Sequence, residues 1–143
     1  MTADLIAFLR ARLDEDEQAA RAAMWDELSA TWTARPPHAA YERYVVVDYC
    51  DDGVVAVSPE NADTDGVGQH IARHDPARAL AEVEAKRKAV HFYEQAVHSL
   101  GASAPGTPPH DLMTGAANTA RAILQALATT YADHPDYRDA WRP

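Results

Sequence analysis

The chain has 143 residues, with 13 lysines and arginines against 22 aspartates and glutamates, and a formal net charge of −9. This acidic balance argues against direct nucleic-acid binding, since such binding relies on basic clusters that displace counterions. The single cysteine, Cys50, excludes an intrachain disulfide and a cysteine-based zinc finger.

The length suits a single domain over residues 1–143, with a core that needs no disulfide. The start, MTADLIAFLRARLDEDE, lacks the basic end and uncharged apolar run of a signal peptide. No apolar segment approaches the ~18 residues of a membrane span. We therefore expect a cytoplasmic protein with no membrane association.

The first predicted helix covers residues 3–27, where Leu5, Ile6, Phe8, Leu9 and Leu13 follow helical spacing. Four consecutive carboxylates, residues 14–17, point around more than half of its circumference and cannot converge on one ion. Asp14 and Glu17 could share a cation as in helical metal-dependent nucleotide hydrolases, but those enzymes need a second such pair, and Glu82 and Glu84 do not repeat the spacing. A solvated helix face is the interpretation that we favour.

Residues 25–43 form a predicted connector that carries Trp25 and Trp32 and crosses Pro36-Pro37. Two interpretations of the tryptophans stay open. They either pack against the core, or they form a partner-binding surface, since tryptophan is a common hot-spot residue of interfaces.

A β-hairpin is predicted for residues 44–58, because two runs rich in β-branched residues flank Asp52-Gly53. We expect a two-residue turn there, with positive φ at both positions. A two-stranded ribbon is only marginally stable alone, so helices, a third strand or a second copy of the chain must cover it.

A kinked helical segment is predicted over residues 67–100. Asp75-Pro76 breaks it, because proline has no N–H and restricts the residue before it, whereas Asp75 is a good N-cap for a new helix. Before the break, Val67, His70, Ile71 and His74 share one helical face. This places both imidazoles on the apolar stripe.

A last helix, capped by Asp111, is predicted over residues 111–132, and residues 133–143 form a tail that lies across a surface. The fold class is therefore α+β and mainly helical, with three main helices packed with a β-hairpin.

The first functional hypothesis is a small non-enzymatic interaction or regulatory protein. The sequence has no Gly-rich phosphate loop and no G-x-S-x-G, so we lean away from an enzyme and expect no cofactor. We expect a protein partner, and self-association stays open. The candidate partner-binding residues are Trp25, Trp32, Tyr137 and Trp141.

The alternative is a metal-binding protein or metal-dependent hydrolase that holds a divalent ion such as zinc. His70 and His74 lie one helical turn apart, which spaces two imidazoles for one ion. Asp75 would complete the site together with His134 or Asp133 from the tail. The segment lacks the glutamate of H-E-x-x-H, because Ile71 follows His70. A third hypothesis is nucleic-acid mimicry, in which the acidic surface inhibits a basic host protein.

Three blocks carry a family resemblance: LIAFLRARLDEDEQAARAA at 5–23, HIARHDPARALAEVEAKR at 70–87 and YADHPDYRDAWRP at 131–143. Their content and order resemble a family of short uncharacterised proteins of actinobacteria, especially streptomycetes, and of their phages and mobile elements. Members carry a Thr-Pro-Gly-Pro-Trp-like element soon after the first block. Here residues 24–28 read Met-Trp-Asp-Glu-Leu instead. The resemblance implies a lineage and contributes no mechanism.

Overall fold

The computed structural model describes residues 2–143, and in this range it has four α-helices, three short strands and three 3-10 helices. The α+β, mainly helical class predicted from the sequence is confirmed. The elements are α1 (Thr2–Ala22), η1 (Leu28–Ala30), β1 (Thr33–Arg35), β2 (Val45–Val47), β3 (Gly53–Ala56), α2 (Thr64–Arg73), α3 (Pro76–Gly101), α4 (Pro108–Ala128), η2 (Thr129–Tyr131) and η3 (Asp139–Trp141).

The chain divides into two compact units. The helical unit comprises the residues up to 15 together with 83–143, and the sheet unit comprises residues 16–82. The single domain expected over residues 1–143 stays a prediction. No helix within residues 2–143 combines the length and the apolar character that a bilayer span requires.

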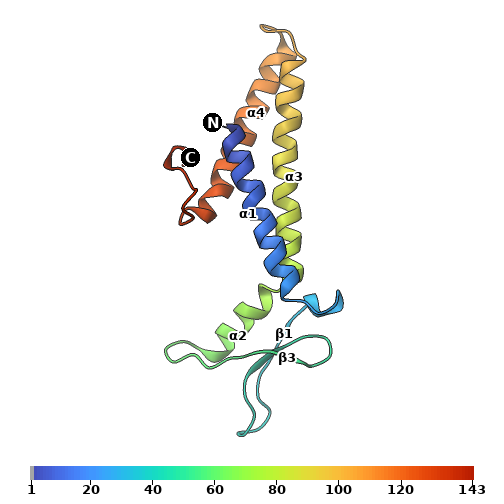
Figure 1. Cartoon of the computed structure of the whole chain (residues 1–143), viewed down its shortest axis with the longest axis vertical. Coiled ribbons are helices and arrows are strands. Elements are labelled where there is room, and N and C mark those ends of the chain that lie inside the picture. Colours follow the sequence, from blue (N-terminus) through green and yellow to red (C-terminus); the bar gives the residue numbers. More distant parts are fainter. Residues whose placement is uncertain (1) are drawn as a thin grey trace. The chain divides into compact units, whose positions relative to one another are not determined.

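In the helical unit, α1, α3 and α4 share one hydrophobic core (Figure 1). α1 contributes its i, i+3, i+4 stripe to this core. Two ion pairs join α1 to α3 at the surface, Arg10 with Glu94 at 2.7 Å and Arg87 with Asp14 at 2.7 Å. The buried members of the core are Leu5, Phe8, Leu9, Val90, Leu124, Ala128 and Trp141.

The C-terminal tail belongs to this core. The ring centroid of Trp141 lies 5.0 Å from that of Phe8, and the Tyr137 ring lies 6.0 Å from Phe8. The Arg138 guanidinium of the tail also pairs with Asp4 of α1 at 2.8 Å. The tail is therefore tied to α1 by apolar and by charged contacts.

The predicted break between two helices is confirmed at Asp75-Pro76, where α2 ends at Arg73 and α3 begins at Pro76. The Asp75 carboxylate accepts a hydrogen bond from the Arg78 N–H at 2.9 Å, which is the geometry of an N-cap.

Two predicted helix boundaries are wrong. α1 ends at Ala22 rather than near residue 27, because the Ser29 hydroxyl accepts the Trp25 and Asp26 N–H groups in a turn. α4 begins at Pro108, with Thr107 and not Asp111 at its N-cap position. Two prolines suit the first helical turn, where their missing N–H groups would have no partner.

The sheet has the antiparallel order β1-β2-β3, so the predicted hairpin acquires a third strand from the segment expected to be a connector. The prediction of a two-residue turn at Asp52-Gly53 is wrong. Val47 pairs with Gly53, the residues between them form the loop, and Asp51, with φ 57°, adopts the left-handed conformation. The Asp48 side chain stabilises this longer loop by accepting the Cys50 N–H at 2.9 Å.

In the sheet unit, α2 packs against the sheet around a small core of Tyr44, Val46, Val57 and Ala72. The Tyr44 ring lies against Gly68 of α2, and its hydroxyl donates to Asp65 at 2.6 Å. This hydrogen bond and burial raise the pKa of Tyr44 from 10.0 to about 12. Val67 and Ile71 face this core as predicted from their spacing.

Replacing Trp141 by alanine should lower the free energy of unfolding by about 3–5 kcal/mol, because an indole that is only 3% exposed would leave a cavity against Phe8. Urea unfolding followed by circular dichroism measures this. The neighbouring Arg142→Ala is the control and should change stability by less than about 0.5 kcal/mol. A loss below about 1 kcal/mol for Trp141→Ala would contradict the tail's place in the core.

Replacing Gly68 by alanine should cost about 1–3 kcal/mol, because the new Cβ would overlap Cε1 of the buried Tyr44 ring and force α2 or the ring to move. Gly53→Ala in the same unit is the control, since its Cβ would meet no atom within 4 Å. Equal stability of the two variants would show that α2 does not pack on Tyr44 in this way.

Candidate functional site

The two histidines of the predicted metal site lie together on α2, with ring centroids 4.3 Å apart. Both side chains are exposed, whereas Val67 and Ile71 of the same predicted stripe face the core. His74 is the C-cap of α2, and its Nδ1 lies 2.8 Å from the His70 carbonyl oxygen. The expected placement of the imidazoles on the apolar stripe is therefore wrong.

The other two predicted metal ligands have separate roles. Asp75 is buried, and its second carboxylate oxygen accepts the Trp32 backbone N–H at 3.2 Å, so both oxygens have protein donors. His134 belongs to the helical unit, where Arg12 Nη1 lies 2.8 Å from its Nδ1 and 2.7 Å from its Nε2. Within residues 2–143 no group of three or more His, Cys, Asp or Glu side chains could hold a metal ion. The metal site stays a prediction.

The four predicted partner-binding aromatics occupy different environments. Trp141 is buried and Tyr137 is half-buried in the helical unit, where both contact Phe8. Trp32 is half-buried in the sheet unit, and Trp25 is 62% exposed there. Of the four, Trp25 offers the largest exposed aromatic surface for a partner.

Trp25 stacks on Tyr49, and we call these two residues the aromatic pair. Their ring centroids lie 5.5 Å apart at an interplanar angle of 22°. The Trp25 Nε1–H donates to Asp48 at 2.8 Å, and the Tyr49 hydroxyl donates to Asp26 at 2.6 Å. The arrangement is reciprocal, because each ring is held by the carboxylate that neighbours the other ring in the sequence.

These hydrogen bonds change the electrostatics of both partners. The bond from Trp25, helped by the Cys50 and Asp52 N–H groups, lowers the pKa of Asp48 from its ordinary 3.8 against the opposing effect of burial. The bond to Asp26 raises the pKa of Tyr49 above its usual range. A carboxylate at the N–H or O–H of a ring also makes the ring face more negative, which favours a cation above it.

Sequence reasoning missed two exposed side chains of the sheet unit, Tyr49 of the aromatic pair and Leu28, which follows Trp25 by three residues in the sequence. Leu28 is 65% exposed and Tyr49 is 48% exposed. The available signal was the pair of dipeptides Trp25-Asp26 and Asp48-Tyr49, each of which joins a ring to a carboxylate. Their pairing across 23 residues depends on the fold and follows no local rule.

The negative charge of the chain is concentrated in the sheet unit. Residues 16–82 contain 13 aspartates and glutamates against 5 arginines and no lysine, so this unit carries −8 of the formal −9. The helical unit is close to neutral. The aromatic pair therefore lies in a strongly acidic part of the chain, where a basic partner is attracted.

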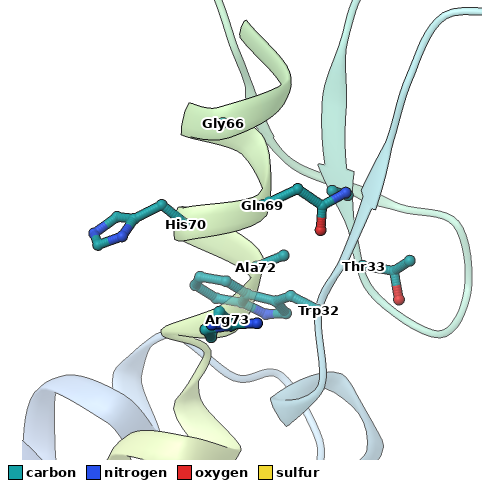
Figure 2. A pocket seen from close by; sticks show the side chains of 8 residues that line it. Trp32, Thr33, Gly66, Gln69, His70, Ala72 and Arg73 are labelled. Carbon is teal, nitrogen blue, oxygen red and sulfur yellow. The ribbon is translucent and has the colours of Figure 1, made fainter. Parts of the chain in front are cut away.

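A groove of about 630 Å³ lies between α2 and β1 in the same unit. Figure 2 shows the side chains that line it, with Trp32 extending from the β1 side toward α2. The Trp32 Nε1–H donates to the Ser29 carbonyl at 3.1 Å, which fixes the indole. The lining residues are Trp32, Thr33 and Ala34 on one side and Gly66, Gln69, His70, Ala72 and Arg73 on the other.

The chain belongs to DUF6221, a family of unknown function whose model matches residues 2–143. Searches of the curated proteins and of the solved structures found no significant match. The match confirms the expected membership of a family of unknown function and brings no activity with it. The actinobacterial or phage lineage and the motifs of the three sequence blocks stay predictions.

Asp48 should contribute stability that depends on pH. Because its folded pKa is below the unfolded value of 3.8, the contribution is complete above about pH 4 and is lost as the pH falls through the folded pKa. Asp48→Asn should therefore be less stable than the wild type at about pH 6, and the difference should shrink toward about pH 2.5. Urea midpoints across this range measure it.

Asp133→Asn controls for the general effect of acid, because Asp133 is exposed and makes no hydrogen bond or ion pair within the described residues. A difference between wild type and Asp48→Asn that stays constant with pH would show that the Asp48 charge does not hold Trp25.

Proposed function

We propose that this chain is a small non-enzymatic interaction protein that binds a basic protein partner through the aromatic pair and Leu28. The observation that carries the proposal is the reciprocal bonding of Trp25 and Tyr49 to Asp48 and Asp26, which holds exposed rings in one fixed arrangement. Large apolar side chains fixed at a surface are typical of binding sites.

The fixed rings reduce the entropic cost of binding. A partner that docks on a flexible aromatic side chain must order it, at about 0.5–1.5 kcal/mol for each immobilised side chain. Trp25 and Tyr49 are already ordered by their stacking and by two charge-assisted hydrogen bonds. Most of their contact energy is therefore available to hold a partner.

The chemistry around the pair favours a cationic partner. Three exposed carboxylates lie close to these residues in the sequence. Glu27 precedes Leu28, and Asp51 and Asp52 lie in the same loop between β2 and β3 as Tyr49. Stacked rings with negative faces attract an arginine guanidinium, and the surrounding carboxylates attract it over a longer range. An arginine-containing surface of another protein satisfies both requirements.

The sequence blocks suggest an actinobacterial or phage origin, so a streptomycete lysate is the first source of partners to test. Capture with the full-length chain followed by cross-linking mass spectrometry should identify a basic protein whose cross-links fall in residues 16–82. The purified pair should then lose about tenfold or more in affinity when Tyr49 and Leu28 are both replaced by alanine.

The matched control replaces Leu112 and Ile123 by alanine, two exposed apolar residues of α4 that are 68% and 51% exposed. This variant should bind as the wild type does. Raising NaCl from about 50 to about 500 mM should weaken the complex, because screening removes the attraction of the acidic unit. Unchanged affinity of the Tyr49/Leu28 variant, or loss in the α4 variant alone, would refute the proposed surface.

A further inference from the structure

We infer that the groove between α2 and β1 is a separate binding site for a small organic acid, a flat apolar molecule that carries one carboxylate. This site does not depend on the proposed protein partner. At about 630 Å³ the groove lies within the range of about 300–1,000 Å³ that is typical of small-molecule sites.

The charge of the groove is opposite to that of its surroundings. None of its lining residues is a carboxylate, although the sheet unit contains 13 of them. Arg73 is the one lysine or arginine of the lining. An anion in this groove would therefore meet a cation and no lining carboxylate.

Arg73 is available to a ligand. In the same unit Arg21 pairs with Glu17 at 2.8 Å, Arg35 with Asp51 at 3.7 Å and Arg78 with Glu82 at 2.8 Å. Within residues 2–143, no carboxylate lies within ion-pair distance of Arg73. A guanidinium binds a carboxylate through two parallel hydrogen bonds, so the unpaired Arg73 favours this ligand group.

Trp32 supplies the flat apolar wall. Its backbone N–H donates to Asp75 and its Nε1–H donates to Ser29, so both of its N–H groups are already satisfied by the protein. What the indole offers to the groove is its ring surface, which prefers a planar ring as a partner. Figure 2 shows the small Ala72 side chain beside the indole, whereas the Thr33 side chain extends from β1 on the side away from α2. The small side chain at this position keeps the groove open beside the indole.

The test compares 2-naphthoate with the neutral 2-naphthamide, which has nearly the same shape. Titration into the ¹⁵N-labelled full-length chain at about 150 mM NaCl, where the field of the acidic unit is screened beyond about 8 Å, reports binding as amide shifts. Saturable shifts are expected at the Trp32 indole and at residues 69–73. The naphthamide should bind about tenfold more weakly or worse.

Arg73→Gln should remove the preference for the acid, with a loss of naphthoate affinity of about tenfold or more. Arg43→Gln is the matched control, since Arg43 is another exposed arginine of the sheet unit with no ion pair in the described chain and it lies outside the groove. The unperturbed spectrum of each variant shows whether it is folded.

The site would be overturned by equal affinity for the acid and the amide, by unchanged binding in Arg73→Gln, or by shifts centred away from Trp32 and α2. Absence of any saturable shift with 2-naphthoate would overturn it as well. The aromatic pair is untouched in these experiments, so failure here is distinguishable from failure of the proposed protein-binding surface.

Discussion

Two buried aspartates organise the sheet unit, and each of them fixes a tryptophan. Asp48, 6% exposed, holds the Trp25 indole, and Asp75, 9% exposed, holds the Trp32 backbone. A buried carboxylate is costly unless donors surround it, so the nearby chain must supply N–H groups in fixed positions. At Asp48 these donors close the loop between β2 and β3, and at Asp75 they begin α3. Satisfying two buried charges thereby positions both candidate binding surfaces.

Local rules predicted the parts of the fold that are decided locally. Asp75-Pro76 is a helix start because of its own backbone chemistry, and the structure confirms it. The strand Thr33–Arg35 was missed because a run of three residues before two prolines is too short for its alternation to predict a strand, and pairing with Val45–Val47 makes it one. The turn at Asp52-Gly53 was predicted wrongly, because the Asp48 side chain stabilises a longer loop that a dipeptide rule does not consider.

In the candidate sites, too, some residues could be identified from the sequence and others only from the fold. Trp25 and Trp32 were named from the sequence because tryptophan is common in binding surfaces. Tyr49 and Arg73 become candidate binding residues only through the groups that the fold places near them. The orientation of Tyr49 depends on stacking with Trp25, 24 residues away in the sequence. Arg73 can bind an anion because no carboxylate of the described residues pairs with it, whereas most arginines of this unit form ion pairs. Trp141 shows the converse, since its residue type suggested a surface role and its packing against Phe8 makes it a core residue.

The negative charge of the sheet unit has opposite effects at its two proposed binding sites, the aromatic pair and the groove between α2 and β1. A cation approaching the aromatic pair is attracted by a unit of charge −8 from beyond contact, whereas an acid approaching Arg73 is repelled until it reaches the groove. Added salt should therefore weaken the first interaction and assist the approach to the second. The net charge of the chain therefore predicts the attraction of a cation to the aromatic pair, but it does not predict the binding of an acid in the groove, which depends on local contacts. A groove lined without carboxylates in so acidic a unit is consistent with a ligand whose recognition depends on contact.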